Sequence, residues 1–227
     1  MRRIVLTIIG LVVALVHISA QDDPQYRMEI GAGVGMVSYE GDFNGNVLKN
    51  MQPMASLLWR YNFDPYKDLR LSASYGKLKG SSADVKTYYP DYAESTYEFN
   101  HNVVDVSLVF EYNFWPYGTG RDYRGAKRLT PYIYGGLGAT SVSGGSKSVF
   151  TANVPIGIGV KYKVRERLNV GLDWGIHFSL NDELDGVKDP YRVKSSGAFK
   201  NTDCYAMLQL TITYSFKANC STCNKEE

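Results

Sequence analysis

Residues 170–179 read VGLDWGIHFS, and their side chains alternate between two kinds along the whole segment. One set is apolar: Val170, Leu172, Trp174, Ile176 and Phe178. The other set is polar or small: Gly171, Asp173, Gly175, His177 and Ser179. Because successive side chains of a β-strand point to opposite faces, this pattern predicts a strand with one apolar and one polar face.

Eight segments of the chain alternate in this way, and no helical period competes over comparable lengths. They are residues 26–38, 52–63, 69–78, 97–114, 129–142, 150–164, 168–180 and 203–216. Short or medium links follow the second, fourth and sixth segments, whereas longer links follow the first, third and seventh. An even number of strands with the shorter turns mostly at one end is typical of outer-membrane barrels. We therefore predict an all-β fold, an eight-stranded antiparallel transmembrane β-barrel.

Aromatic residues mark one end of this barrel. The second, fourth, sixth and eighth segments end in Tyr61, Phe63, Tyr112, Phe114, Trp115, Tyr162, Tyr214 and Phe216. Tyrosine and tryptophan concentrate at membrane–water interfaces, and the short links of such barrels lie in the periplasm. The apolar faces are thus predicted to contact lipid, with this aromatic belt at the periplasmic interface.

The polar faces then point into the lumen. The charged or titratable residues assigned to it are Arg27, Glu29, Arg60, Arg70, Asp105, Glu111, Lys161, Lys163, Asp173 and His177. Eight strands enclose a space just wide enough for side chains. An unpaired charge there would cost several kcal/mol. We therefore predict an internal network of paired charges that plugs the barrel, not a pore.

The remaining segments give the domain organisation. Arg2 and Arg3 precede an apolar run, and ISA ends at Ala20, which predicts a signal peptide at residues 1–20. The barrel is assigned to residues 21–217 and a periplasmic tail to residues 218–227. Removing the signal peptide leaves equal numbers of basic and acidic residues, and no nucleic-acid motif occurs.

Catalysis has weak support. Asp173, His177 and Ser179 share one face, and some outer-membrane enzymes act on lipids through a histidine and a serine. No third orienting group can be assigned, so we interpret them as ordinary lumen residues. A single CxxC, Cys220 to Cys223, supplies half a zinc site. We predict a protein that is not an enzyme, with no catalytic residues, metal, cofactor or small-molecule substrate.

The tail and one link are candidate partner contacts. Cys220 and Cys223 follow the last segment, whereas Cys204 lies at the opposite rim and cannot pair with either. We hypothesise that the tail docks on a periplasmic partner. Link 115–128 carries Arg121, Arg124 and Lys127 on the same side. It is either a second docking surface or a basic rim facing lipid headgroups, and the sequence leaves both open.

Three stretches carry a family resemblance. They are EIGAGVGMVSYEGDFNG (29–45), RLTPYIYGGLGA (128–139) and PIGIGVKYKVRERLNVGLDWGIHFSLNDELDGV (155–187). The chain resembles the PorG-type outer-membrane proteins of the Bacteroidetes type IX secretion system. This implies a non-enzymatic component of protein export, associated with the periplasmic ring of PorK and PorN. The alternative is a small barrel acting through its extracellular loops, adhesin-like or lipid A-modifying, with loop 181–202 as the contact.

Overall fold

The computed structural model describes residues 26–41, 44, 50–82, 96–117, 127–144, 148–181, 184 and 203–218. The predicted signal peptide lies outside this part of the chain, as does the tail beyond Ala218. Within the described ranges, no helix is long and apolar enough to cross a membrane.

Eight strands account for nearly all of the described residues, and each predicted segment falls on one of them. The strands are β1 (Tyr26–Glu40), β2 (Gln52–Asp64), β3 (Lys67–Ser81), β4 (Glu98–Asn113), β5 (Leu129–Ser143), β6 (Val149–Lys163), β7 (Leu168–Ser179) and β8 (Cys204–Ala218). The main differences from the prediction are in β3, which is longer at both ends. Its extra residues are polar at both ends, so the apolar alternation in the sequence stops before the ladder does.

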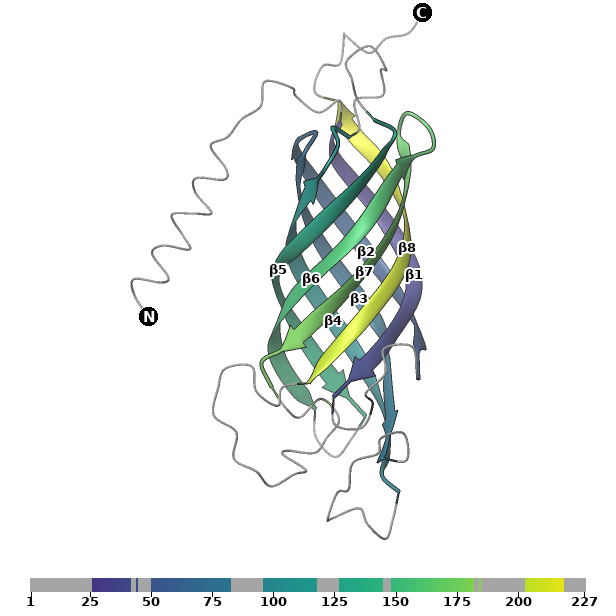
Figure 1. Cartoon of the computed structure of the whole chain (residues 1–227), viewed down its shortest axis with the longest axis vertical. Helices are drawn as coiled ribbons and strands as arrows, with labels where there is room; N and C mark the ends of the chain where they lie inside the picture. Colours follow the sequence, from purple (N-terminus) through teal and green to yellow (C-terminus); the bar gives the residue numbers. More distant parts are fainter. Residues whose placement is uncertain are drawn as a thin grey trace, which may run out of the picture.

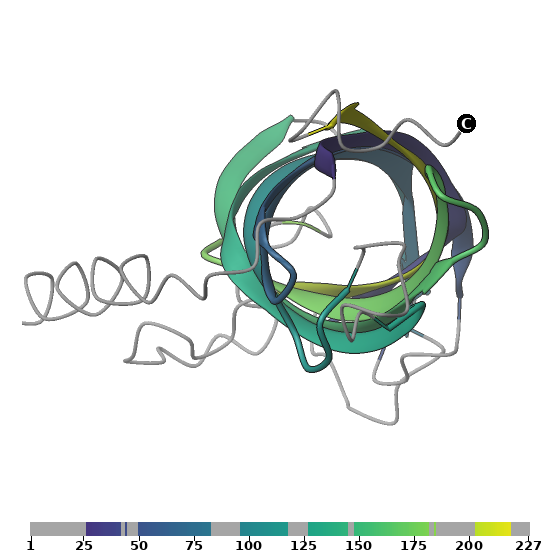
Figure 2. The ribbon, with the colours of Figure 1, turned by 90° about the horizontal axis from the view of Figure 1, so that it is seen from above.

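Each strand pairs with its neighbour along the chain, and β1 pairs antiparallel with β8 to close the ring. Figure 2 shows this ring from one end, and Figure 1 shows its tilted strands from the side. Closure leaves no unpaired strand edge, which a membrane barrel requires because lipid cannot hydrogen-bond to the backbone. The predicted fold class is confirmed.

The two ends of the barrel differ. We call the end where β1 begins and β8 finishes the termini end, and the opposite end the loop end (Figure 1). At the termini end, Pro65 and Tyr66 form the β2–β3 turn, and residues 164–167 join β6 to β7. Backbone bonds from Tyr117 N to Pro65 O (3.0 Å) and from Lys127 N to Pro116 O (2.7 Å) fasten the β4–β5 link over this end.

The middle of the outer surface is apolar on every strand. Val34, Leu57, Leu137 and Ile156 are each more than half exposed, a degree of exposure that would be unfavourable in water. At the termini end, the exposed side chains become aromatic: Phe63, Tyr112, Phe114, Trp115, Tyr162 and Tyr214. An apolar band bordered by aromatic residues matches the surface that such barrels present to lipid.

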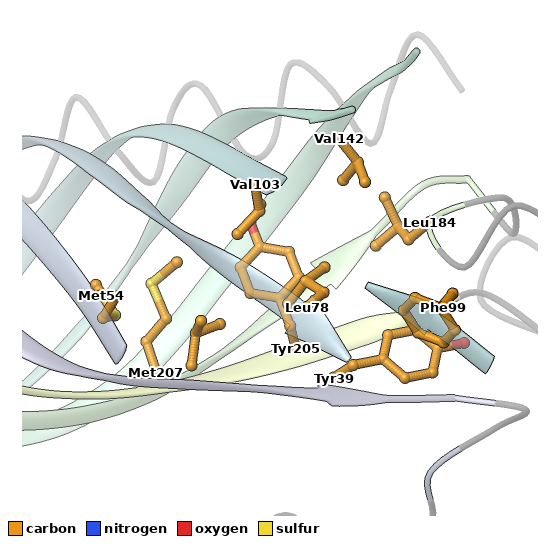
Figure 3. Close-up of a cluster of buried hydrophobic side chains, with 10 residues drawn as sticks. Tyr39, Met54, Leu78, Phe99, Val103, Val142, Leu184, Tyr205 and Met207 are labelled. Carbon is orange, nitrogen blue, oxygen red and sulfur yellow. The ribbon is translucent and has the colours of Figure 1, made fainter. Parts of the chain in front are cut away.

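The interior has two halves. Toward the loop end, buried apolar side chains from six strands and from Leu184 pack together (Figure 3). They are Val37, Tyr39, Met54, Leu78, Phe99, Val103, Val142, Leu184, Tyr205 and Met207. Toward the termini end, charged side chains fill the lumen. The apolar half was not predicted from the sequence. Its members alternate with outward residues just as the charged lumen residues do, so the pattern alone does not divide the lumen into an apolar and a charged half.

Glycines on β6 and β7 make room for the rings of Tyr132 and Tyr134 on β5. A Cβ atom at Gly159 would lie 2.5 Å from Tyr132 Cζ, and one at Gly157 would lie 2.4 Å from Tyr134 Cζ. Both rings are buried. This part of the lumen is therefore filled by large side chains of β5 that pack against the glycine backbone of β6 and β7.

Candidate functional site

The charged half of the lumen forms one connected group, which we call the luminal charge cluster. Its members are Glu29, Arg60, Asp68, Arg70, Glu111, Lys161, Lys163 and Asp173, and all are buried. They comprise four cations and four carboxylates, contributed by six of the eight strands. Charges so far from water are stable when they pair with one another, and the formal balance of this cluster satisfies that condition.

Glu111 on β4 lies at the centre of the luminal charge cluster and is fully buried. Its carboxylate contacts three cations: Arg60 Nε at 2.9 Å, Arg70 Nε at 3.0 Å and Lys161 Nζ at 2.5 Å. These partners come from β2, β3 and β6. The contacts therefore run across the lumen and hold separate parts of the wall together.

The other carboxylates complete these pairs. Arg60 Nη1 lies 2.5 Å from Glu29 Oε2, and Arg70 Nη1 lies 3.5 Å from Asp173 Oδ2. Neutral groups satisfy the remaining carboxylate oxygens: Thr213 donates to Glu29 at 3.0 Å, and Gln209 donates to Asp173 at 2.9 Å. Such additional hydrogen bonds are what make a buried ion pair favourable, since they offset the loss of water.

Two of the cations in the luminal charge cluster lie over aromatic rings. Lys161 Nζ lies 4.5 Å from the centre of the Tyr132 ring, and Arg70 Cζ lies 4.8 Å from that of Tyr134. At the termini end, Tyr117 closes the lumen by donating to Asn169 Oδ1 at 3.0 Å. Burial, with the nearby Glu29 carboxylate, raises the pKa of Tyr117 far above its ordinary value, so this phenol remains a donor.

A second polar group lies between the luminal charge cluster and the apolar half, and Asp105 is its centre. Asp105 Oδ2 accepts hydrogen bonds from Asn153 Nδ2 at 2.6 Å and from Tyr205 Oη at 2.7 Å. His177 Nδ1 lies 3.5 Å from the same oxygen, and its ring stacks on Tyr205 with centres 4.9 Å apart. These contacts hold the carboxylate of Asp105 in place inside the lumen.

The hydroxyl of Ser179 is also engaged in hydrogen bonds. Its hydroxyl is fully buried, donates to the backbone oxygen of Asn181 at 3.0 Å and accepts from the backbone nitrogen of the same residue at 3.0 Å. This closes a local turn where β7 ends. A serine nucleophile needs a base within hydrogen-bond reach and an approach for substrate, and the hydrogen bonds of Ser179 serve the turn.

Arg27 differs in burial from the other residues assigned to the lumen: it is half-buried at the termini end of β1, where its neighbour Tyr26 is buried. Of the predicted partner contacts, Lys127 is exposed at the termini end, whereas Arg121, Arg124, Cys220 and Cys223 lie outside the described residues.

Asp68 is a member of the cluster that the sequence prediction missed. It precedes Leu69, at which the predicted segment began, but shares the inward face with Arg70. Extending the alternation by one residue would have found it. Cys204 carries a free thiol at the loop end. Among the described residues, no group of three or more metal-binding side chains is placed to hold a metal ion.

A family model matches residues 2–225, which is nearly the whole chain. The chain belongs to the DUF6089 family, described as a domain of unknown function. This DUF6089 protein matches no curated protein by sequence.

Solved structures similar to this DUF6089 chain include small outer-membrane barrels. The N-terminal β-barrel domain of Pseudomonas aeruginosa OprF is 17% identical and covers 86% of this chain and 100% of its own, with a TM-score of 0.47. Neisserial surface protein A is 13% identical, with coverages of 83% and 97% and a TM-score of 0.49. OprG of P. aeruginosa is 12% identical, with coverages of 88% and 100% and a TM-score of 0.48.

Proposed function

We propose that this protein is a non-enzymatic outer-membrane component of the type IX protein secretion system. In this role the barrel spans the membrane with its termini end in the periplasm. It anchors, or associates with, the periplasmic ring of PorK and PorN, and it is needed for the export of cargo proteins. The proposal joins the sequence resemblance to a geometry that suits an anchor.

The observation that carries the proposal is the filled lumen. Glu111 and its three cationic partners join four strands across the interior, and buried apolar side chains fill the other half. A barrel packed in this way is suited to neither transport through its centre nor storage of a ligand. Its role is therefore expected at its ends, where partners can reach it.

The termini end offers a surface for such a partner. Lys127, Arg128, Arg165 and Arg167 are exposed there, with Glu166 as an acidic neighbour. Trp115 is exposed beside them. Tryptophan and arginine are enriched where proteins bind one another. A basic surface next to the membrane also attracts lipid phosphates, so the experiment must separate the two roles.

The experiment is a mild-detergent pull-down of the tagged protein from its own outer membrane, with and without reductant. We expect PorK and PorN to co-purify, and any covalent adduct to disappear in a Cys220→Ser/Cys223→Ser variant. Charge reversal by Lys127→Glu/Arg165→Glu should reduce recovery of the ring, whereas Glu98→Lys at the loop end should not. Recovery of the barrel alone under every condition would refute the anchor and leave the loop end as the place of action.

The lipid A-modifying alternative depends on Ser179 and His177. The hydroxyl of Ser179 is engaged by the backbone of Asn181, and the ring of His177 is packed against Tyr205. These contacts favour the non-enzymatic role over a lipid-modifying one.

A further inference from the structure

The outward face of β3 changes character toward the loop end. From Leu69 to Tyr75 its outward side chains are apolar or aromatic, whereas Lys77 and Lys79 are both exposed. Their inward neighbour Leu78 is completely buried, which fixes the direction of the two lysines. They therefore point outward from the barrel wall, on the side that faces lipid.

The outward side chains of the neighbouring strands β4 and β5 also become polar at this level. Lys77 pairs with Asn102 on β4, which in turn pairs with Ser143 on β5, and Lys79 pairs with Asn100. We call Lys77, Lys79, Asn100, Asn102 and Ser143 the lysine patch. One step toward the termini end, the outward residues are Tyr75 and Val104. The Tyr75 hydroxyl donates to Asn102 Oδ1 at 3.4 Å, across the boundary between the two zones.

The height of the lysine patch matches a membrane boundary. On β4 the outward apolar residues run from Val104 to Tyr112, beyond which lies the aromatic belt. At about 3.4 Å per residue and a tilt of about 40°, these residues span roughly 20 Å of barrel height. The hydrocarbon band of such barrels is about 25 Å tall. The lysine patch thus begins where the hydrocarbon region ends, on the side opposite the aromatic belt.

Within the part of the chain that the structure describes, the two lysines of the patch have no counter-charge. Neither Lys77 nor Lys79 has an ion-pair partner among the described residues, although they are two positions apart on one face and repel one another. On β3 and β4 themselves, the outward acidic side chain nearest by register is Glu98, opposite Ser81, farther toward the loop end. Every other member of the patch carries a hydrogen-bond donor. Two exposed cations next to amide and hydroxyl donors suit an anion with several acceptor oxygens, such as a phosphate.

We propose that the lysine patch binds the phosphate groups of the phosphorylated glycolipid that forms the outer leaflet of the outer membrane. The long side chains of Lys77 and Lys79 reach from the apolar wall to the headgroup level, as lysines near the hydrocarbon boundary do. The inference rests on the proposed placement of the termini end in the periplasm, because that placement puts the patch at the outer leaflet.

Binding of labelled lipid A to the full-length protein in mild detergent tests the proposal. We expect the Lys77→Gln/Lys79→Gln variant to bind bisphosphorylated lipid A roughly 10- to 30-fold more weakly than the wild type. Lys77→Arg/Lys79→Arg retains the charge and should bind as the wild type does.

Two results would overturn the proposal. One is equal affinity of the wild type and the Lys77→Gln/Lys79→Gln variant for bisphosphorylated lipid A, provided that both proteins show the heat-dependent gel shift of a folded barrel. The other is an equal loss of affinity for lipid A from which both phosphates have been removed, since the contact would then be with acyl chains or sugars.

A labelling experiment separates failure of this inference from failure of the placement. Lys79→Cys is introduced into a Cys204→Ser/Cys220→Ser/Cys223→Ser background and treated with a membrane-impermeant maleimide. Labelling on intact cells supports the placement, so an absence of phosphate preference would then count against the lysine patch alone. Labelling only after the cells are opened would overturn the placement and the inference together.

Discussion

The Nζ atom of Lys161 on β6 lies 2.6 Å from Oδ2 of Asp68 on β3, so this ion pair crosses the lumen instead of following the sheet. Two strands, β4 and β5, separate the two residues around the ring in the shorter direction. Asn113 supports both partners: it donates to Asp68 at 2.8 Å and accepts from Lys161 at 3.1 Å. Contacts of this kind connect walls that share no backbone hydrogen bonds, and they make the lumen part of the barrel's stability.

Replacing the central carboxylate should test this role. We expect Glu111→Gln to lower the free energy of unfolding by about 3–5 kcal/mol, because Arg60, Arg70 and Lys161 would keep their charges in a buried site with too few anions. The measurement is the denaturant midpoint of the gel shift between folded and unfolded barrel. Glu98→Gln, at the exposed loop end of the same strand, should change it by less than about 0.5 kcal/mol. Equal effects of the two substitutions would contradict a structural role for the luminal charge cluster.

Glycines that face the lumen should tolerate substitution by alanine less well than glycines that face lipid. A Cβ atom at Gly157 would lie 2.4 Å from Tyr134 Cζ and 2.5 Å from the Trp174 backbone oxygen. We therefore expect Gly157→Ala to destabilise the barrel by about 1–3 kcal/mol. At Gly135 the nearest atom would be the Pro155 oxygen, 3.8 Å away, so Gly135→Ala is the matched control and should be nearly neutral. Thermal unfolding of both variants in the same detergent decides the point, and a neutral Gly157→Ala would show that the Tyr134 ring moves aside.

The filled lumen predicts the absence of ion conduction. An eight-stranded barrel is just wide enough for its own side chains, and here both halves of the interior are packed. In planar bilayers we expect no stable conductance steps from the wild-type protein at neutral pH, under conditions in which a reconstituted porin conducts. Reproducible, ohmic openings of the wild type would be incompatible with a lumen closed by the contacts of Glu111.

Substitution of Ser179 should leave membrane lipids unaltered. Its hydroxyl bonds to the backbone of Asn181 and is fully buried. We expect Ser179→Ala and wild-type cells to have the same lipid A mass spectrum. His177→Phe, which preserves stacking on Tyr205, should give that spectrum as well. A change in acyl chains or phosphates in either variant would favour the lipid-modifying alternative.

Much of this barrel could be predicted from the sequence because one physical rule governs every strand. Alternation assigns each side chain to lipid or lumen, so Glu29, Arg60 and Glu111 could be placed inside without knowledge of their partners. Alternation says nothing about which lumen residues meet, since that depends on the register between strands. The Glu111–Lys161 contact joins β4 to β6, and the sequence offers no marker for it. The sequence likewise does not mark the burial of Tyr26 beside the half-buried Arg27 at the end of β1.

The origin of the luminal charge cluster on six strands has a consequence for biogenesis. Arg60 meets Glu29 within the first hairpin, but Lys161 and Asp173 arrive only with β6 and β7, and Thr213 donates to Glu29 only once β8 has joined β1. A half-built sheet would therefore expose uncompensated charges on its concave side. We expect that side to stay hydrated until the last strand is in place, so that expulsion of water and completion of the ring occur as one step.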